Sequence, residues 1–301
     1  MSQDDEMIQQ PRFPDFFILG AAKSGTTSLH AWLAQHSEIA MSEPKEPFFF
    51  EAEYERGVAF YWHRYFSHWN GERVLGDARH RNLYLPYIPQ RISASAPNAR
   101  FVAILRNPVR RAWSHWWHWF ARGREDLYFE AALEQDMLRI AAGDEIATPE
   151  QIAHYAAELG EDGRGPDRTY LDTGYYAIQL RRYFELFPRD RFKIMILEEV
   201  VKNPQQHCAD LLEFLQVNPS EAETIRYDVA NNADSMNPRV AARWTTTRVH
   251  ELLRSGAPPS APPIVTQAPS MSRSIEAWLK AHYAPHNDAL AELLGRRLPW
   301  G

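Results

Sequence analysis

The chain has 301 residues, of which 45% are hydrophobic and 24% charged, and it carries a formal net charge of -6. This length and apolar content suffice for a buried core in one large domain or two small ones. The acidic balance argues against a general nucleic-acid binder, which needs a basic surface, so no nucleic-acid partner is expected.

The same sequence features predict the compartment. No stretch of about 18 apolar residues occurs, so no membrane span is expected. Residues 1–10 are polar and acidic, which excludes a secretory signal. The single cysteine, Cys208, rules out an internal disulfide framework and is typical of a reducing environment. We therefore expect a cytoplasmic protein in which residues 1–14 are a disordered lead-in and residues 15–301 form a single domain.

The first informative stretch is a strand, a loop and a helix. Aromatic and β-branched residues at 16–19 predict a short buried strand, and apolar residues recur at helical spacing from Leu29 to about His36. The first turn of a helix presents unpaired N–H groups and partial positive charge, so a glycine-containing loop before a helix is a potential anion site. Gly25 allows a phosphate to approach closely, and Lys23 adds a cation. Hydroxyl donors are expected from the loop and the first turn: Ser24, Thr26, Thr27 and Ser28.

We interpret this loop as a binding site for a nucleotide 5′-phosphate. It differs from the nucleoside-triphosphate pattern G-x-x-x-x-G-K-[ST], because Thr26 stands where the lysine belongs and Lys23 lies two residues before Gly25. A tight strand-to-helix turn with a solvated lysine is the alternative.

A second short strand is predicted at residues 39–41, and a charged pair follows it. Lys45 and Glu46 lie between Pro44 and Pro47, ahead of three consecutive phenylalanines. The prolines disfavour a helix and keep the backbone extended. The segment is either a functional site or a polar turn whose phenylalanines enter the core.

The third informative stretch begins with the apolar residues 100–105, which predict a buried parallel strand. Arg106 follows at the carboxyl end, where open α/β sheets bind ligands, and a helix over 109–120 begins just after Pro108. Ser114 lies about two turns into that helix. An arginine fork and a hydroxyl from these elements could hold a phosphate. The alternative is that Arg106 pairs with an acid and Ser114 faces a neighbouring helix.

The other predicted elements complete an alternation of strands and helices. Helices are expected over 54–69, 88–96, 174–187, 203–215 and 274–294, and strands over 73–77, ending in Asp77, and 191–197, with an insertion at 125–164 and a proline-rich loop or arm at 255–270. This alternation predicts an α/β fold with a central parallel sheet of about five strands flanked by helices on both faces, of P-loop nucleotide-binding type.

Together these motifs resemble the sulfotransferases that use 3′-phosphoadenosine-5′-phosphosulfate (PAPS), especially the bacterial and heparan sulfate sulfotransferase branch. The resemblance extends over nearly the whole chain. Residues 20–27 are similar to the family's 5′-phosphosulfate loop, including the displaced lysine. Residues 105–114 are similar to its 3′-phosphate motif, and residues 45–50 to the segment that carries the catalytic glutamate. Residues 174–180, the strand end at Glu198 and residues 293–300 fit later landmarks of the family.

The resemblance implies roles for the candidate residues. Glu46 is expected to be the general base, with apolar neighbours such as Phe48 and Phe49 raising its basicity. Lys23 is expected to stabilise the leaving group, so that no metal is required. Cofactor binding is implied for Lys23, Ser24, Gly25, Thr26, Thr27, Ser28, Arg106, Ser114, Tyr176 and Arg239.

The sequence also departs from the family pattern. The family often has a histidine where Phe48 stands, and Ala78–Arg81 replaces the usual Ser/Thr-Pro after Asp77. The family's late basic loop over the cofactor has its nearest match at Asn237–Arg239. Four arginines could favour an anionic acceptor: Arg79, Arg81, Arg122 and Arg124.

The expected function is transfer of a sulfuryl group from PAPS, as co-substrate, to a hydroxyl or amine of a small-molecule or carbohydrate acceptor. Two alternatives are open. One is a P-loop nucleotide kinase or hydrolase, against which the displaced lysine counts. The other is a non-catalytic nucleotide-binding module.

Overall fold

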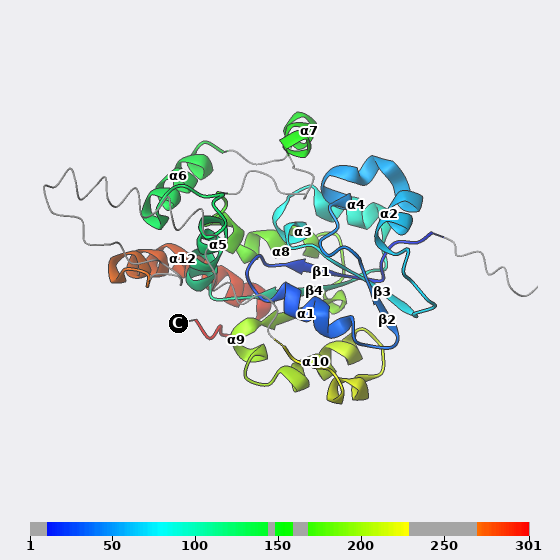
Figure 1. Ribbon diagram of the computed structural model, residues 1–301. Coiled ribbons are helices and arrows are strands. Elements are labelled where there is room, and N and C mark those ends of the chain that lie inside the picture. Colours follow the sequence, from blue (N-terminus) through cyan, green and yellow to red (C-terminus); the bar gives the residue numbers. More distant parts are fainter. Residues whose placement is uncertain (1–10, 144–147, 159–167, 229–269, 301) are drawn as a thin grey trace, which may run out of the picture. The chain divides into compact units, whose positions relative to one another are not determined.

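The computed structural model describes residues 11–143, 148–158, 168–228 and 270–300 (Figure 1). The chain divides into two compact units. The first comprises residues 1–105, 146–166 and 178–228, and the second comprises residues 106–145, 167–177 and 229–301.

The first unit is built on a five-stranded parallel sheet with the strand order β2-β3-β1-β4-β5. The strands are β1 Phe16–Gly20, β2 Ile39–Met41, β3 Val74–Ala78, β4 Arg100–Leu105 and β5 Phe192–Ile196. Phe17 of the central strand lies opposite Asp77 of β3 and Phe101 of β4. Every residue of β1 is buried, as its uninterrupted apolar run predicts for a strand covered on both faces. The predicted parallel α/β sheet is confirmed.

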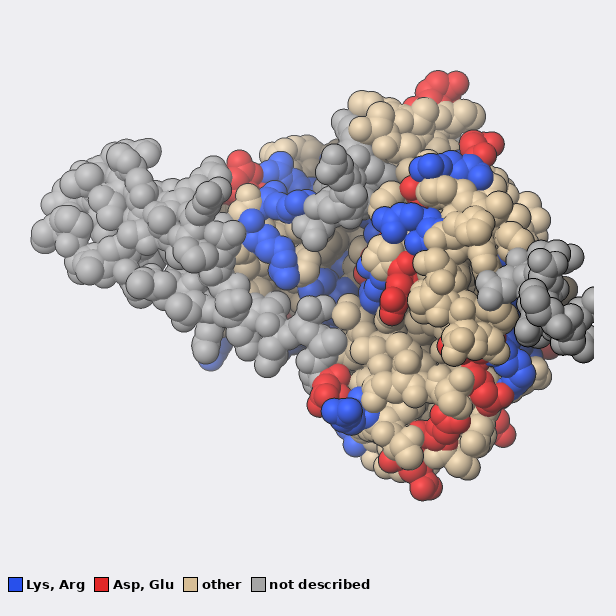
Figure 2. Space-filling view, turned by 45° about the vertical axis from the view of Figure 1, so that its right-hand side comes forward, with Lys and Arg blue, Asp and Glu red and all other residues tan. Residues whose placement is uncertain are grey.

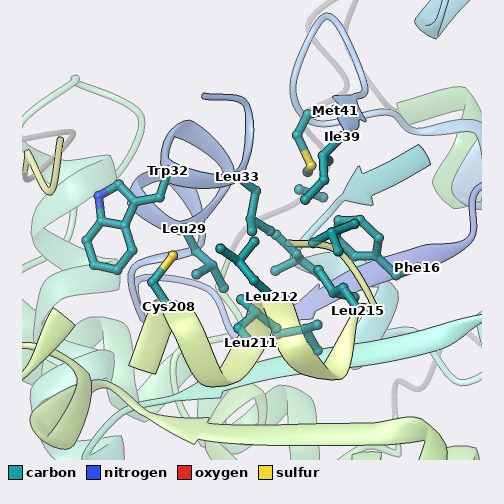
Figure 3. Close-up of a cluster of buried hydrophobic side chains, with 14 of the residues drawn as sticks. Phe16, Leu29, Trp32, Leu33, Ile39, Met41, Cys208, Leu211, Leu212 and Leu215 are labelled. Atoms are coloured by element: carbon teal, nitrogen blue, oxygen red, sulfur yellow. The ribbon is translucent and has the colours of Figure 1, made fainter. Parts of the chain in front are cut away.

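One face of this sheet is covered by α1 Thr26–Leu33 and α10 Pro204–Phe214. Figure 3 shows apolar side chains of these two helices packed together with those of β1 and β2. Leu29, Trp32 and Leu33 recur at positions i, i+3 and i+4, which lie on one side of a helix and are all buried here. The helical spacing seen in the sequence is therefore the spacing that holds α1 against the sheet.

The opposite face is lined by aromatic residues. Phe17 contacts Phe50, and Phe101 contacts Tyr183, with ring centroids 5.4 Å apart in both pairs. Figure 1 shows α3, α4 and α8 on the side of the sheet opposite α1 and α10, so helices flank both faces as predicted. The remaining elements of this unit are η1 Phe49–Glu53, η2 Tyr54–Arg56, α2 Gly57–Tyr65, α3 Arg81–Tyr84, α4 Ile88–Ser95, α7 Pro149–Glu158, α8 Tyr176–Phe184, η4 Arg189–Arg191, α9 Leu197–Val200 and η5 Pro219–Glu223. The first two residues of α8 belong to the second unit.

Three predicted boundaries differ from the structure. The helix expected over 54–69 is interrupted and becomes regular only over Gly57–Tyr65. The third strand extends to Ala78, so that Asp77 lies inside it rather than at its end. The helix expected from Gly174 begins at Tyr176, because residues 172–174 form a 3-10 turn instead. The proline-rich residues 255–270 lie almost wholly outside the described part of the chain.

The second unit is helical in its described part, with α5 Pro108–Phe120, α6 Phe129–Ala141, η3 Asp172–Gly174 and α12 Arg273–Leu294. Its core is formed largely by aromatic side chains of α5, including Trp116, Trp117 and Trp119, with Tyr283 of α12. The tryptophan-rich helix is therefore core-forming. Gly174 packs so tightly on Tyr283 that a Cβ at this position would lie 2.8 Å from the tyrosine ring.

None of the helices that the structure describes is both long enough and apolar enough to span a lipid bilayer.

Candidate functional site

The loop that joins β1 to α1 has the geometry of an anion site. Lys23 and Gly25 both adopt left-handed backbone conformations, with φ of 61° and 93°. Gly25 is required for space as well, because a Cβ there would lie 3.0 Å from a methyl group of Leu197. The loop is fixed at its start by the amide of Ala21, which donates to the carbonyl of Ile104 at 2.8 Å.

The start of α1 presents the first backbone N–H groups of a helix N-terminus. Gly25 occupies the N-cap and supplies no side-chain cap, so the amides of the first turn have no partner within the helix. Thr27 is half-buried, as is Lys23, whereas Ser24, Thr26 and Ser28 are buried. These features match the loop expected from the sequence, and the binding roles of its residues stay predictions.

Glu46 lies among basic groups. Its Oε1 accepts a hydrogen bond from Lys45 Nζ at 2.9 Å. Its Oε2 lies 2.5 Å from His80 Nδ1 and 3.4 Å from a terminal nitrogen of Arg79. The side chain is 23% exposed, so the carboxylate is held by these contacts and still reaches the surface.

The electrostatic consequence is opposite to the one expected from the sequence. Burial alone would raise the pKa of Glu46, but the facing His80, Lys45 and Arg79 outweigh it and hold the pKa well below its ordinary value. The expectation that Phe48 and Phe49 raise the basicity of Glu46 is therefore wrong. Phe49 is buried and packs against Tyr61 in the core, whereas the carboxylate contacts Lys45 and Arg79.

Glu43 differs from Glu46 because its side chain is exposed. The residue is exposed, and its backbone amide donates to the carbonyl of Tyr65 at 2.9 Å. Residues 43–46 form bends rather than the extended strand assumed in the sequence argument. The two glutamates differ in environment, with Glu46 half-buried and Glu43 at the surface.

A buried ion cluster lies next to Glu46. Glu51 is fully buried, and its carboxylate accepts hydrogen bonds from Arg79 Nε at 2.7 Å and from the hydroxyl of Tyr155. Arg81 lies 3.7 Å from the same carboxylate. Buried charges need such partners, because their desolvation is costly.

This cluster corrects the acceptor hypothesis for two arginines. Arg79 and Arg81 are buried and paired with Glu51, so the expectation that they face an anionic acceptor is wrong. Arg79 instead bridges Glu51 and Glu46. The sequence reasoning missed Glu51 and Tyr155, because no local pattern marks them as the partners of the two arginines.

Asp77 is a buried carboxyl group in β3. The hydroxyl of Tyr61 donates to its Oδ2, while Oδ1 has no hydrogen-bond partner in the described structure. Burial raises the pKa of Asp77 to about 7, although the hydrogen bond from Tyr61 acts in the opposite direction. The group is therefore substantially protonated near neutral pH.

In the second unit, Arg106 precedes α5 and is half-buried. Its carbonyl oxygen accepts a hydrogen bond from the hydroxyl of Tyr176 at 2.9 Å. The structure thus brings together two residues that are 70 positions apart and that were both assigned to the cofactor. This contact runs through the main chain of Arg106.

The start of α5 is capped by Asn107. Its side chain accepts hydrogen bonds from the amides of Val109 at 3.0 Å and Arg110 at 3.2 Å, and Pro108 fills the first helical position. Ser114 lies about two turns further along and is half-buried. The sequence reasoning missed the role of Asn107, although Asn before Pro at a helix start is a capping signal.

Arg239, which the sequence resemblance assigns to the cofactor, lies outside the described residues. Within the part of the chain that is described, no group of three or more His, Cys, Asp or Glu side chains is arranged to hold a metal ion.

The surface carries mixed charge. On the face drawn in Figure 2, basic side chains form several separate groups with acidic side chains between and beside them. This pattern agrees with the net charge of -6.

Comparison with known protein families gives one match that covers most of the chain. A family model described as the sulfotransferase domain matches residues 13–258. In the solved structures, a sulfotransferase from Alicyclobacillus acidocaldarius is similar to this chain with a TM-score of 0.66 and 26% identity, covering 95% of this chain and 97% of that one.

Curated relatives give a consistent result. The human bifunctional heparan sulfate N-deacetylase/N-sulfotransferase 2 is 25% identical over 229 residues, which cover 72% of this chain and 24% of the relative. The human heparan sulfate glucosamine 3-O-sulfotransferase 6 is 24% identical over 293 residues, which cover 96% of this chain and 74% of the relative. The chain spans about a quarter of the length of the first of these relatives.

Proposed function

Because the chain belongs to the sulfotransferase family, we propose that it transfers the sulfuryl group of PAPS to a hydroxyl or amine of an acceptor. The observation that carries this proposal lies in the first unit: a lysine-bearing anion loop and a carboxylate held ionised among cations. His30 of α1 lies with its Nε2 3.1 Å from the carbonyl oxygen of Ser42. This contact joins the helix that follows the loop to the segment that carries Glu46.

The loop residues would bind the 5′-phosphosulfate end of the donor. The first amides of α1 have no acceptor within the helix, and the helix dipole favours negative charge there. Ser24, Thr26, Thr27 and Ser28 surround the backbone turn, and Lys23 adds a formal positive charge. These features support a phosphosulfate ligand over an uncharged one.

In the proposed reaction the acceptor oxygen or nitrogen forms a bond to sulfur while the bond between sulfur and the bridging oxygen breaks. The products are the sulfated acceptor and 3′-phosphoadenosine-5′-phosphate (PAP). Negative charge builds on the bridging oxygen as it leaves, and Lys23 would stabilise that charge. As in phosphoryl transfer, positioning and electrostatic stabilisation would provide most of the rate enhancement.

Glu46 would accept the proton that the acceptor loses. Its low pKa keeps it ionised at neutral pH, which is the state that accepts a proton, although the same shift makes it a weaker base than an ordinary glutamate. The contacts from Lys45, His80 and Arg79 fix both carboxylate oxygens, which reduces the cost of orienting the base. Arg79 is itself held by Glu51, so the orientation of Glu46 depends on the buried cluster.

The second unit would bind the 3′-phosphate of the donor through Arg106 and Ser114. A guanidinium matches a phosphate with two parallel hydrogen bonds, and a serine hydroxyl adds a donor. Tyr176 supports this assignment because it holds the carbonyl of Arg106. Arg239 is proposed to contribute from the late basic segment, on the basis of the sequence resemblance alone.

We propose a carbohydrate hydroxyl or amine as the acceptor group. The names of two similar proteins refer to heparan sulfate, and one refers to its glucosamine. An amine and a hydroxyl both carry a proton that must leave as the new bond to sulfur forms, which is the role proposed for Glu46.

The test is a transfer assay with radiolabelled PAPS and a panel of acceptors: desulfated heparan sulfate, N-deacetylated heparan sulfate, a monosaccharide glucosamine and a simple phenol. Transfer of label to at least one acceptor, with release of PAP, is expected. Release of phosphate from ATP without sulfuryl transfer would favour a nucleotide kinase or hydrolase. PAP binding without transfer to any acceptor would favour a binding module.

A further inference from the structure

Tyr155 is a buried side chain on α7. Its relative exposure is 2%, whereas Ala153 and His154 of the same helix are exposed. The helix packs against η1, and the hydroxyl of Tyr155 donates a hydrogen bond to Oε1 of Glu51 in η1. This side chain therefore joins α7 to the buried ion cluster beside Glu46.

The hydroxyl of Tyr155 is a neutral donor to a buried carboxylate. Burial raises the pKa of the Tyr155 phenol above its ordinary value, although Arg81, whose guanidinium carbon lies 5.5 Å from the centroid of the ring, acts in the opposite direction. The phenol therefore keeps its proton near neutral pH. Because hydrogen bonds to an ionised acceptor are roughly twice as strong as neutral ones, this contact orients the carboxylate of Glu51.

The carboxylate of Glu51 in turn fixes the guanidinium of Arg79. Arg79 donates to Oε2 of Glu51 from Nε at 2.7 Å, and its Nη2 contacts the same oxygen. The remaining nitrogen, Nη1, lies 3.4 Å from Oε2 of Glu46. A guanidinium is planar and rigid, so its three nitrogens turn together. The direction in which Nη1 points therefore follows the orientation of the Glu51 carboxylate.

The two oxygens of Glu51 have different partners. Oε2 faces Arg79, whereas Oε1 accepts from Tyr155 and lies 3.7 Å from Nε of Arg81. Without the Tyr155 hydroxyl, Oε1 would still be attracted by Arg81, so the carboxylate would turn toward Arg81 and away from Arg79. The main chain of Glu51 has its own anchor, because the hydroxyl of Tyr87 donates to its carbonyl at 3.1 Å. Tyr155 thus acts on the side chain of Glu51, and Tyr87 on its main chain.

We propose that Tyr155 is a positioning residue for Glu46, acting through Glu51 and Arg79. This inference rests on the proposed function, in which Glu46 accepts the proton of the acceptor. The packing of α7 on η1 then contributes to the alignment of the base, although Tyr155 is 104 positions from Glu51 in the sequence. The segment predicted as an insertion at 125–164 thereby takes part in the reaction.

The charge of Arg79 gives this role a measurable signature. Burial raises the pKa of Glu46, but the groups facing it outweigh that effect: His80, Lys45 and Arg79. Two other titratable groups interact with the charge of Glu46: Asp77 of β3 and His30 of α1. Turning the guanidinium of Arg79 away removes one of the charges that stabilise the carboxylate, so the pKa of Glu46 rises.

The experiment compares Tyr155→Phe with Tyr87→Phe. Both variants remove a buried hydroxyl that donates to Glu51, but Tyr155 donates to the carboxylate and Tyr87 to the main-chain carbonyl. The pKa of Glu46 is measured in the ligand-free protein by carbon NMR of labelled glutamate carboxyl groups, with the signal assigned from Glu46→Gln. Turnover is measured as a function of pH at saturating PAPS and acceptor, and PAP affinity is measured by calorimetry.

For Tyr155→Phe we expect turnover to fall about tenfold to a hundredfold, as for a small misplacement of a catalytic group. The pKa of Glu46 should rise, the acid limb of the turnover profile should move to higher pH with it, and PAP affinity should stay unchanged. Tyr87→Phe should match the wild type in turnover and in the pKa of Glu46. Adding Tyr155→Phe to Glu46→Gln should cause no further loss, because both changes act through the same carboxylate.

Several outcomes would overturn the inference. Unchanged turnover, or an unchanged pKa of Glu46, in Tyr155→Phe would show that the hydroxyl does not act on the base. Equal effects of Tyr155→Phe and Tyr87→Phe, or a further loss in the double variant, would show a general packing role. Loss of PAP binding in Tyr155→Phe would show that Tyr155 maintains the fold.

A failure of the proposed function is recognised separately. If the wild type transfers label to no acceptor, the proposed function is wrong and the positioning role fails with it, whatever the pKa of Glu46 does in Tyr155→Phe. A wild type that transfers label while Tyr155→Phe keeps full turnover overturns this inference alone.

Discussion

The replacement Glu46→Gln tests the proposed general base with little change in shape. Glutamine keeps an oxygen that can accept the hydrogen bond from Lys45, now 2.9 Å from Oε1. Its amide nitrogen would face His80 and Arg79, which contact Oε2 at 2.5 Å and 3.4 Å. The fold should survive, because Arg79 remains bound to the buried Glu51 and Glu46 is itself only half-buried.

The expected effect of Glu46→Gln is a loss of about 10²–10⁴ in turnover, the usual contribution of a positioned base. PAP affinity should stay within a factor of about two, because the residue is assigned to the acceptor proton and not to the nucleotide. Glu43→Gln is the matched control, since Glu43 is three residues earlier and exposed, and it should retain full activity. The assay is the initial rate of label transfer at saturating PAPS and acceptor, with PAP affinity measured by calorimetry.

The pH dependence sharpens this test. Because the pKa of Glu46 is held well below its ordinary value of 4.5, turnover should not fall with pH until the medium is more acidic than that value. Lys45→Met removes one of the cations that lower the pKa, so the acid limb of the profile should move to higher pH. Near-full activity of Glu46→Gln would refute the assignment of the base. An acid limb that does not move in Lys45→Met would refute the electrostatic argument.

Further outcomes follow from the same geometry. Lys23→Ala should reduce turnover by more than it reduces PAP affinity, because the charge that Lys23 stabilises develops in the transition state. Unchanged turnover at saturating substrate would show that Lys23 only binds the donor. Arg106→Ala should weaken PAP binding roughly tenfold to a hundredfold, because a charge-assisted hydrogen bond is lost, and should change adenosine monophosphate binding little. Equal losses for both nucleotides would contradict the 3′-phosphate role. Burial raises the pKa of Asp77 from 3.8 to about 7, so the folded state binds a proton more tightly than the unfolded state. The wild type therefore loses up to about 4 kcal/mol of unfolding free energy as the pH rises from 3.8 to about 7. Denaturant titrations of Asp77→Asn should therefore lack this loss, and a parallel pH dependence in both proteins would show that Asp77 is ionised in the fold.

The pairing of residues around Glu46 depends on tertiary structure. Lys45 adjoins Glu46 in the sequence, but His80 and Arg79 come from the segment that follows β3, 34 and 33 positions away. Local composition placed Glu46 beside phenylalanines and predicted a raised pKa. The fold turns those rings into the core and the carboxylate toward the cations, which reverses the sign of the shift.

The same reason explains why Arg79 and Arg81 were misassigned. An arginine after a strand reads as a surface cation, since arginine is mostly exposed in proteins. Only the packing of η1 against both α3 and α7 shows that Glu51 and Tyr155 lie next to these side chains. Burial and pairing are properties of several segments at once, so no single segment encodes them.

The sequence by itself determined the elements that depend on local pattern. The apolar runs at Phe16–Gly20 and Arg100–Leu105 specify buried parallel strands, the spacing of Leu29, Trp32 and Leu33 specifies α1, and Gly25 specifies a left-handed turn ahead of that helix. The tertiary structure alone decided which charges meet, because long-range contacts set desolvation and electrostatic coupling. The lowered pKa of Glu46 and the raised pKa of Asp77 both arise in this way.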